Sequence, residues 1–290
     1  MALPEPGITP ALGSEILRGW DLEAWRNWRT LLRRTPADAA EERRRLGLAS
    51  PYSDPALVRR PRVYAKFIVD LHARSLITFK PAAVNTVGLF FVPKKLKNNT
   101  DLRLILDTRL ANCDFLPPWH TALPSAAAWS GLELNADDPL LLAQTDVNNA
   151  FYRIGVPAGL EECFLLPQVK ASLLTELGIV LPEEVAADAV VSPALTVLAM
   201  GFSWSLYFCQ RMVEACVENC GISRHQFARD RQPAPRIDEG ELSGAVYVDG
   251  AAILGIDGDK VDSNIAAVKE ALDQVGLQCP NLELSGKDQI

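Results

Sequence analysis

The chain has 290 residues, of which 48% are apolar and 22% charged, and this composition excludes a wholly disordered, collagenous or low-complexity protein. Its formal charge of −7, taken over the whole chain, argues against a nucleic-acid binder. The charge is unevenly divided, however, because residues 1–110 carry 19 basic and 11 acidic side chains and residues 111–290 carry 10 and 25. The resulting net charges of +8 and −15 predict a basic surface that meets a polyanion and an acidic part that holds cations.

The cysteines and the apolar segments indicate the cellular compartment in which the protein is expected. Six cysteines contain no CxxC pair and three histidines lie far apart, so we expect buried reduced thiols and not a zinc site. Residues 1–15 lack the basic start and apolar core of a signal peptide. Pro193 and Gly201 interrupt the most apolar window, 190–209. We therefore expect a soluble intracellular protein without a membrane span.

Residues 1–58 are predicted to form an N-terminal helical extension. One long helix, 14–34, is indicated by large apolar residues at helical spacing: Leu17, Trp20, Trp25, Trp28 and Leu32. We interpret this stripe as packing, and the arginines around it either as solvated or as a nucleic-acid contact. Several prolines between 35 and 61 then mark a connection to the main body.

The main body, 59–290, is predicted to mix helices and hairpins. Helices are expected at 63–76, 125–134, 168–189, 204–219 and 262–275, with a turn or short helix at 148–153. Strands are expected at 87–92 and 102–107 around a polar loop, at 140–146, and at 245–248 and 251–256 around an Asp-Gly turn. The sequence therefore predicts an α+β fold.

The first hairpin carries a group of cations. Lys94 and Lys95 lie in its predicted loop, and Arg103 lies on the strand that follows. Lysine supplies a point charge and arginine a forked donor, and both suit the phosphates of a nucleotide. A solvated loop is the alternative reading of this segment alone.

Two aspartates are candidates for a metal site. Asp146 ends an apolar strand, and Asp249 lies at the predicted hairpin turn with Gly250. Carboxylates on adjacent antiparallel strands can share two Mg²⁺ ions and promote phosphoryl transfer. Taken singly, each aspartate also reads as an ordinary cap or turn residue.

These segments, in this order, resemble the reverse transcriptase family of retroelements, which are right-hand polymerases. VPKKLKNNTDLRLILDTRLAN resembles the fingers hairpin, TDVNNAFY and AVYVDGAAILG the two catalytic palm motifs, and AMGFSWSLYFCQ the motif that contacts template and nucleotide. The resemblance covers residues 59–290 and ends after the last palm helix and strand. It implies fingers and a palm, with an antiparallel palm sheet backed by helices and without a thumb.

The resemblance also implies a role for each matching residue. Asp146 and Asp249, with the backbone oxygen of Val147, would bind two Mg²⁺ ions, with Mn²⁺ as an alternative. Phe151 would be the steric gate against a ribose 2′-hydroxyl. The remaining nucleotide-binding residues would be Lys94, Lys95, Arg103, Gly201 and Gln210. The expected partners are an RNA or DNA template with its primer and dNTPs.

One departure from the family pattern bears on activity. The family usually has Tyr-x-Asp-Asp in its second catalytic motif, whereas this chain has Tyr247-Val248-Asp249-Gly250. Loss of one carboxylate should weaken the hold on metal. The sequence therefore favours a weak RNA-directed DNA polymerase, and leaves open a catalytically degraded retroelement remnant that only binds nucleic acid or a protein partner.

Overall fold

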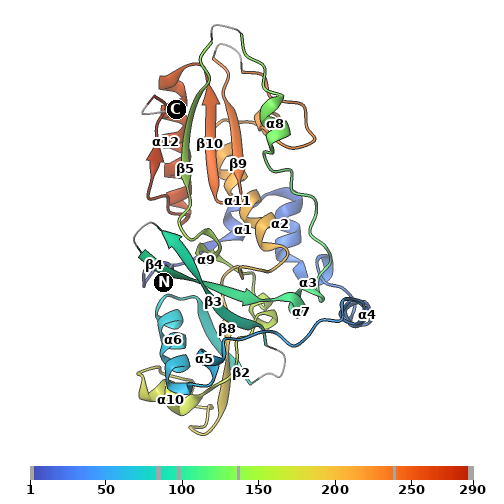
Figure 1. The fold of residues 1–290 in the computed structure, drawn as a ribbon, viewed down its shortest axis with the longest axis vertical. Helices are drawn as coiled ribbons and strands as arrows, with labels where there is room; N and C mark the ends of the chain where they lie inside the picture. The colour runs from blue at the N-terminus through green and yellow to red at the C-terminus, as the bar shows by residue number, and fades with distance from the viewer. Residues whose placement is uncertain (1–2, 83–85, 97–98, 136–137, 238–239, 287–290) are drawn as a thin grey trace. The chain divides into compact units, whose positions relative to one another are not determined.

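The computed structural model describes residues 3–82, 86–96, 99–135, 138–237 and 240–286, and the side chains of 94–96 and 99–101 lie outside the described part. The chain forms two compact units, each discontinuous in sequence (Figure 1). Unit 1 comprises residues 1–10, 24–117 and 151–205, and unit 2 comprises 11–23, 118–150 and 206–290. Residues 1–58 are thus divided between the two units.

Unit 1 is built on a three-stranded sheet and a hairpin. Its sheet has the order β2-β8-β7, and β3 pairs with β4 over the whole length of both strands. Its elements are α3 (Trp28–Leu31), α4 (Pro36–Leu46), α5 (Pro55–Val58), α6 (Pro61–Ala73), β2 (Ile77–Pro81), β3 (Gly88–Leu96), β4 (Asn99–Asp107), α7 (Arg109–Asn112), α9 (Ala150–Arg153, whose first residue belongs to unit 2), β6 (Ile154–Gly155), the 3₁₀ turn η1 (Leu160–Cys163), β7 (Val169–Lys170), α10 (Ala171–Glu176) and β8 (Val190–Leu195).

Helix α6 shows how the sequence builds unit 1. Pro61 occupies its first position, where a missing N–H costs nothing. Phe67, Ile68 and Leu71 are buried at helical spacing, and the ring of Phe67 meets Phe91 of β3 edge-on at 5.5 Å between centroids. The predicted helix is therefore present, although Val63 is 48% exposed, outside the buried stripe.

Unit 2 is built on a four-stranded antiparallel sheet with the order β11-β5-β10-β9. Its elements are β1 (Ala11–Leu12), α1 (Gly13–Ile16), most of α2 (Gly19–Arg26), α8 (Ala126–Ser130), β5 (Leu141–Asp146), α11 (Ser205–Asn219), the 3₁₀ turn η2 (Arg224–Gln226), β9 (Ser243–Tyr247), β10 (Gly250–Gly255), α12 (Gly258–Gln274) and β11 (Leu282–Glu283). The pairings within the β11-β5-β10-β9 sheet, the β2-β8-β7 sheet and the β3-β4 hairpin are all antiparallel, and helices pack against the sheets, so the predicted α+β class is confirmed.

Helix α12 covers β5 and β10 of this sheet (Figure 1). Its buried face is an apolar stripe at helical spacing: Val261, Ile265, Val268 and Leu272. The Asp257 side chain caps the helix by accepting from the amide of Lys260 at 3.3 Å. A second apolar cluster surrounds Ala245 and Leu254, with Trp129 and Leu142 against it. Local pattern and packing thus agree in this helix and in the sheet that it covers.

Two predicted helices are wrong. The single helix expected over 14–34 is broken into α1, α2 and α3, because Leu17 is extended and Gly19 has a φ of +52°. The helix expected over 168–189 is limited to α10, beyond which Gly178 has a φ of +89° and Pro182 follows. Gly19 interrupts the first predicted helix, and Gly178 and Pro182 follow the end of the second, where the apolar spacing alone suggested continuation.

The first hairpin is longer than predicted. Residues expected to form a polar loop continue the ladder, with Lys95 opposite Thr100 and Leu96 opposite Asn99. Backbone pairing therefore extends almost to the tip. No helix among the described residues has the length and apolarity needed to cross a bilayer.

Candidate carboxylate site

Asp146 and Asp249 come together at one end of the sheet of unit 2. Asp146 is the last residue of β5 and lies opposite Gly250, the first residue of β10, whereas Asp249 directly precedes that glycine. The amide of Val147 donates to the carbonyl oxygen of Asp249 at 2.9 Å. Two acidic residues 103 positions apart in sequence are therefore neighbours, held by the strand register.

The two carboxylates affect each other electrostatically. Burial raises the pKa of Asp249 above its usual value. A backbone hydrogen bond lowers this pKa, and the negative charge of Asp146 raises it. Within the part of the chain that the structure describes, no lysine or arginine forms an ion pair with either residue. The site therefore concentrates negative charge that a bound cation would neutralise.

The donor set fits Mg²⁺ in its chemistry. Magnesium prefers hard oxygen ligands in octahedral geometry and often binds through one or two carboxylates together with water and phosphate. Asp146 is exposed and Asp249 half-buried, so both are accessible from solvent. Among the described residues there is no group of three or more His, Cys, Asp or Glu side chains that could hold a metal. Water or substrate would have to supply the other ligands.

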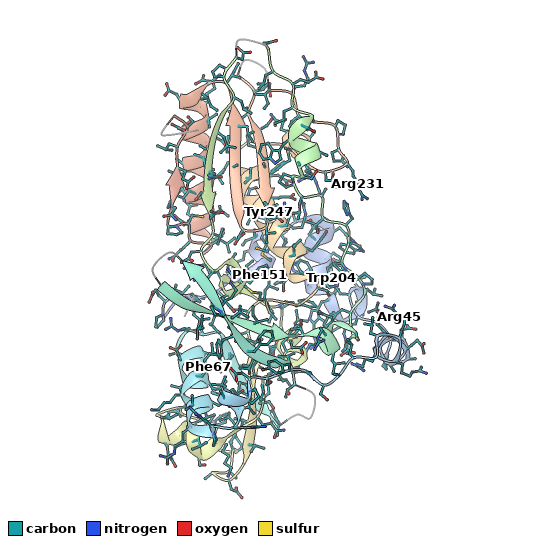
Figure 2. All side chains as sticks on the ribbon, in the orientation of Figure 1. Arg45, Phe67, Phe151, Trp204, Arg231 and Tyr247 are labelled. Atoms are coloured by element: carbon teal, nitrogen blue, oxygen red, sulfur yellow. The ribbon has the colours of Figure 1, made fainter. Side chains whose placement is uncertain are left out.

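The turn that carries Asp249 is displaced by one residue from its prediction. The turn residues are Val248 and Asp249, because Gly250 already pairs with Tyr247 across the hairpin. Val248 has a φ of +59°, which is unfavourable for a β-branched side chain. Tyr247, just before it, is 59% exposed (Figure 2). The hairpin therefore turns at Val248-Asp249, although the Asp-Gly pair is the locally preferred turn.

Gln210 holds this strained turn in place. The amide of Val248 donates to Oε1 of Gln210 at 2.7 Å, and Nε2 of Gln210 donates to the carbonyl of Val246 at 2.8 Å. Gln210 lies on α11 and is 1% exposed. Its side chain thus acts on the carboxylate site through the hairpin backbone.

A buried ion network lies behind Gln210. Nε2 of Gln210 also donates to Glu214 at 2.9 Å, and Glu214 pairs with Arg211 and, at 3.0 Å, with Arg229. Arg211 in turn donates to Asp21 at 2.9 Å. Burial lowers the pKa of Arg229 to about 10, and the charge of the neighbouring Arg211 contributes. The turn is therefore connected to the N-terminal residue Asp21 through Gln210, Glu214 and Arg211, and Arg229 is a second cation beside Glu214.

This ion network was not predicted from the sequence. A signal was present, because Arg211 and Glu214 are charged residues three positions apart on a helix that is otherwise mostly apolar. Charges on the buried face of a helix require partners, which here come from residues distant in sequence. Asp21 and Arg229 have no such local signal.

The other candidate residues lie in unit 1. Arg103 is exposed on β4, and Phe151 is half-buried on α9 (Figure 2). Lys94 and Lys95 lie on β3, and their side chains are outside the described part. Unit 1 thus contains the predicted cations and the predicted gate, while unit 2 contains both aspartates, Val147 and Gln210.

Gly201 is required by its backbone and its surroundings. Its φ is +115°, and a Cβ atom there would lie 2.9 Å from the carbonyl oxygen of Leu106 and from Oγ1 of Thr108. The carbonyl of Gly201 accepts from Nδ2 of Asn112 at 2.9 Å, and Oδ1 of Asn112 accepts from the amide of Ser203. The segment before α11 is therefore fastened tightly to the end of the first hairpin.

Comparison of the sequence with protein-family models gives no match, and no curated protein matches the chain.

Proposed function

We propose that the chain is a right-hand polymerase palm with fingers, and that it catalyses RNA-directed addition of dNTPs to a primer 3′-hydroxyl. The observation that carries this proposal is the meeting of Asp146 and Asp249 at one end of an antiparallel sheet. The motif order along the chain, which resembles that of reverse transcriptases, supplies the reaction class. The unbalanced negative charge of the pair supplies a reason for the residues to take up a divalent cation.

Each residue would then have a definite task. Two Mg²⁺ ions, when bound, would activate the 3′-hydroxyl and neutralise the charge that develops during phosphoryl transfer. Asp146 and Asp249, with the backbone oxygen of Val147, would hold them. Arg103, with Lys94 and Lys95, would bind the triphosphate by charge. Gln210 would act as a positioning residue, because it fixes the turn that carries Asp249.

Gly250 supports a second candidate function. Gly250 takes the place of the second aspartate of the family pattern. Among the described residues, Asp146 and Asp249 are therefore the only carboxylates that could bind a metal at this end of the sheet. A remnant that lost catalysis would bind nucleic acid or a protein partner only. Primer extension on RNA and DNA templates, with Mg²⁺ and then Mn²⁺, separates the two candidates.

Gly250→Asp is expected to raise primer extension. The φ of Gly250 lies outside the left-handed region, so its backbone accepts a side chain. The new Cβ would lie 2.7 Å from Oδ1 of Asp146, and the Asp146 carboxylate must therefore rotate away. We expect that small adjustment to be outweighed by the third negative charge, with extension about tenfold or more above the parent.

Gly250→Asn is the matched control, because it demands the same adjustment without adding charge. The parent should extend weakly or not at all, and better with Mn²⁺ than with Mg²⁺. If the parent and Gly250→Asp both fold, bind primer-template and add no nucleotide under either metal, the remnant is the correct candidate.

Phe151→Ala is expected to admit ribonucleotides. An aromatic ring beside the sugar excludes a 2′-hydroxyl by its volume, so removing the ring should lower the preference for dNTPs by about tenfold or more. Side-by-side incorporation of dNTPs and rNTPs measures this, in the Gly250→Asp background if the parent is too weak. Phe151→Tyr keeps the ring and should keep the preference. Unchanged discrimination in Phe151→Ala would assign the gate to another residue.

A further inference from the structure

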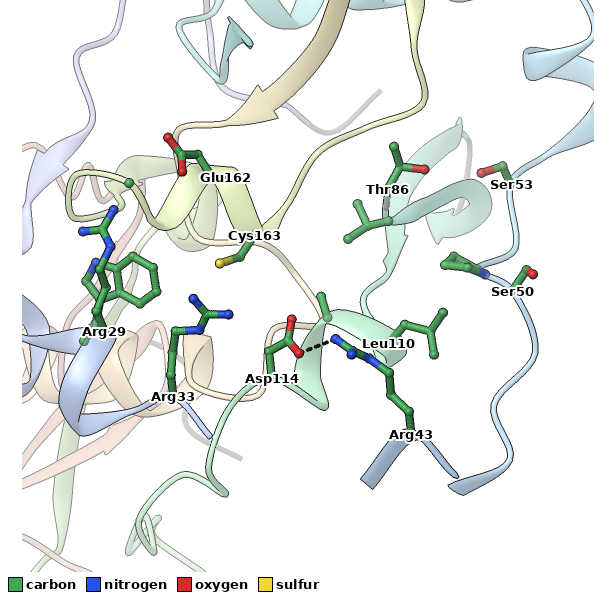
Figure 3. A pocket seen from close by; sticks show the side chains of 15 residues that line it. Arg29, Arg33, Arg43, Ser50, Ser53, Thr86, Leu110, Asp114, Glu162 and Cys163 are labelled. Carbon is green, nitrogen blue, oxygen red and sulfur yellow. Dashed lines mark hydrogen bonds and ion pairs between the residues drawn. The ribbon is translucent and has the colours of Figure 1, made fainter. Parts of the chain in front are cut away.

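Unit 1 contains a pocket of about 720 Å³ whose wall is rich in arginine (Figure 3). Arg29, Arg33 and Arg43 come from the N-terminal helices and the turn between them, while Thr86 and Cys163 come from later segments. This volume is in the range of sites that hold a small ligand. The polymerase proposal gives the pocket no task.

Two of the three arginines have no acidic partner among the residues that the structure describes. Arg43 pairs with Asp114, and Glu162, the other acid in the wall, pairs with Lys80 at 3.4 Å. Arg29 donates to the carbonyl of Ala158 at 3.2 Å and stacks on the Trp28 ring at 4.6 Å. Neither Arg29 nor Arg33 forms an ion pair with any residue that the structure describes. Lys80 also pairs with Glu161 at 3.0 Å, so it does not fully neutralise Glu162, and the pocket wall carries one positive charge in excess.

These two guanidinium groups face the same space. Figure 3 shows Arg29 and Arg33 side by side, with Arg33 directed toward Cys163. Burial raises the pKa of the Cys163 thiol to about 11, and the charge of Arg33 lowers it. The charges of Asp114 and Glu162 raise this pKa further, and that of Arg29 lowers it. Arg29 also packs against Gly159, where a Cβ atom would collide with its guanidinium. The chain thus holds one of the arginines in position without neutralising it.

We infer that this pocket binds the phosphate group of a nucleotide or of a nucleic-acid strand. Guanidinium groups present forked donors that match phosphate oxygens, and the hydroxyls of Ser50 and Thr86 in the wall add polar partners. Trp28 is 2% exposed, so its ring is not available for stacking on a base. Recognition is therefore by phosphate, independent of base identity. This inference does not rest on the polymerase proposal.

The first test is binding of the 290-residue chain to a fluorescein-labelled dT12 oligonucleotide, without metal and at about 0.15 M salt, followed by anisotropy. The Arg29→Gln/Arg33→Gln variant should bind about tenfold or more weakly, since hydrogen bonds to charged groups contribute about 1.5–3 kcal/mol each. Arg26→Gln/Arg44→Gln is the matched control, because it removes the same charge from exposed arginines of the same region outside the pocket wall. Its affinity should change less than about twofold. Equal losses in the two variants would overturn the inference.

The second test locates the ligand in the parent protein and needs no variant. Alkylation of Cys163, followed by peptide mass spectrometry at alkaline pH, should slow when the pocket is filled, whereas the half-buried Cys220 of unit 2 should react at an unchanged rate. Protection by dTMP identifies a nucleotide phosphate as sufficient, and protection by dT12 alone identifies a strand. If neither probe nor inorganic phosphate protects Cys163, the pocket is not a phosphate site.

Discussion

Asp249→Asn is expected to abolish stabilisation of the protein by Mg²⁺ or Mn²⁺ and to raise its stability when no metal is present. In the parent, a metal at a hundred times its dissociation constant should add about 2.7 kcal/mol to the free energy of unfolding. The variant removes one of two carboxylates that repel each other across the β5–β10 register. Thermal unfolding with and without metal measures both effects and requires no catalysis.

The pH dependence of the same site has a definite sign. Because the folded pKa of Asp249 is raised, the folded protein binds this proton more tightly than the unfolded chain does. The resulting stabilisation is complete below the unfolded pKa and is lost as the pH rises through the folded pKa. In Asp249→Asn, the free energy of unfolding should no longer decrease through this contribution as the pH rises across the acidic range.

Asp146→Asn should reproduce the metal effect, because a single carboxylate remains in either variant. Asp188→Asn, which changes an exposed residue of unit 1, should leave the metal response unchanged. A metal-dependent shift that survives in both Asp146→Asn and Asp249→Asn would mean that the cation binds elsewhere, and the two-metal proposal would fail without any activity measurement.

Glu214→Ala is expected to give a large loss of stability, about 3–5 kcal/mol. Glu214 is 3% exposed and pairs with both Arg211 and Arg229. Removing it leaves two cations buried without this partner, and Gln210 loses one of its hydrogen bonds. Urea unfolding should show a lower midpoint with an unchanged slope, the signature of a stability change alone.

Two further variants separate charge from packing at this position. Glu214→Gln retains an acceptor for Gln210 and should fall between the parent and Glu214→Ala. Glu270→Ala, on the exposed part of α12, should cost less than about 0.5 kcal/mol. If Glu214→Ala costs no more than Glu270→Ala, the network does not stabilise unit 2 and Gln210 holds the turn unaided.

Local patterns in the sequence determined much of both units. The strand predicted at 140–146 and the helices predicted at 204–219 and 262–275 lie within a few residues of β5, α11 and α12. Their apolar residues recur at the period of the element, so each buries one face regardless of what covers it. The juxtaposition of Asp146 and Asp249 was suggested by motif order and not by local pattern, since register between distant strands leaves no local trace.

Tertiary structure alone decided the details that shape the candidate site. Val248, and not Gly250, adopts the left-handed conformation, because Gln210 of α11, 38 residues earlier, binds its amide. The hydrogen bonds that the buried side chain of Gln210 makes with the hairpin backbone outweigh the local preference for an Asp-Gly turn. Gln210 is too far away in sequence to be recognised from the residues around the turn. The same holds for the ion network, in which Arg229 reaches Glu214 and Asp21 reaches Arg211 from separate segments of the chain. Sequence therefore predicted many of the elements but not the strands β2, β7 and β8, and packing determined which charges meet and where the chain is strained.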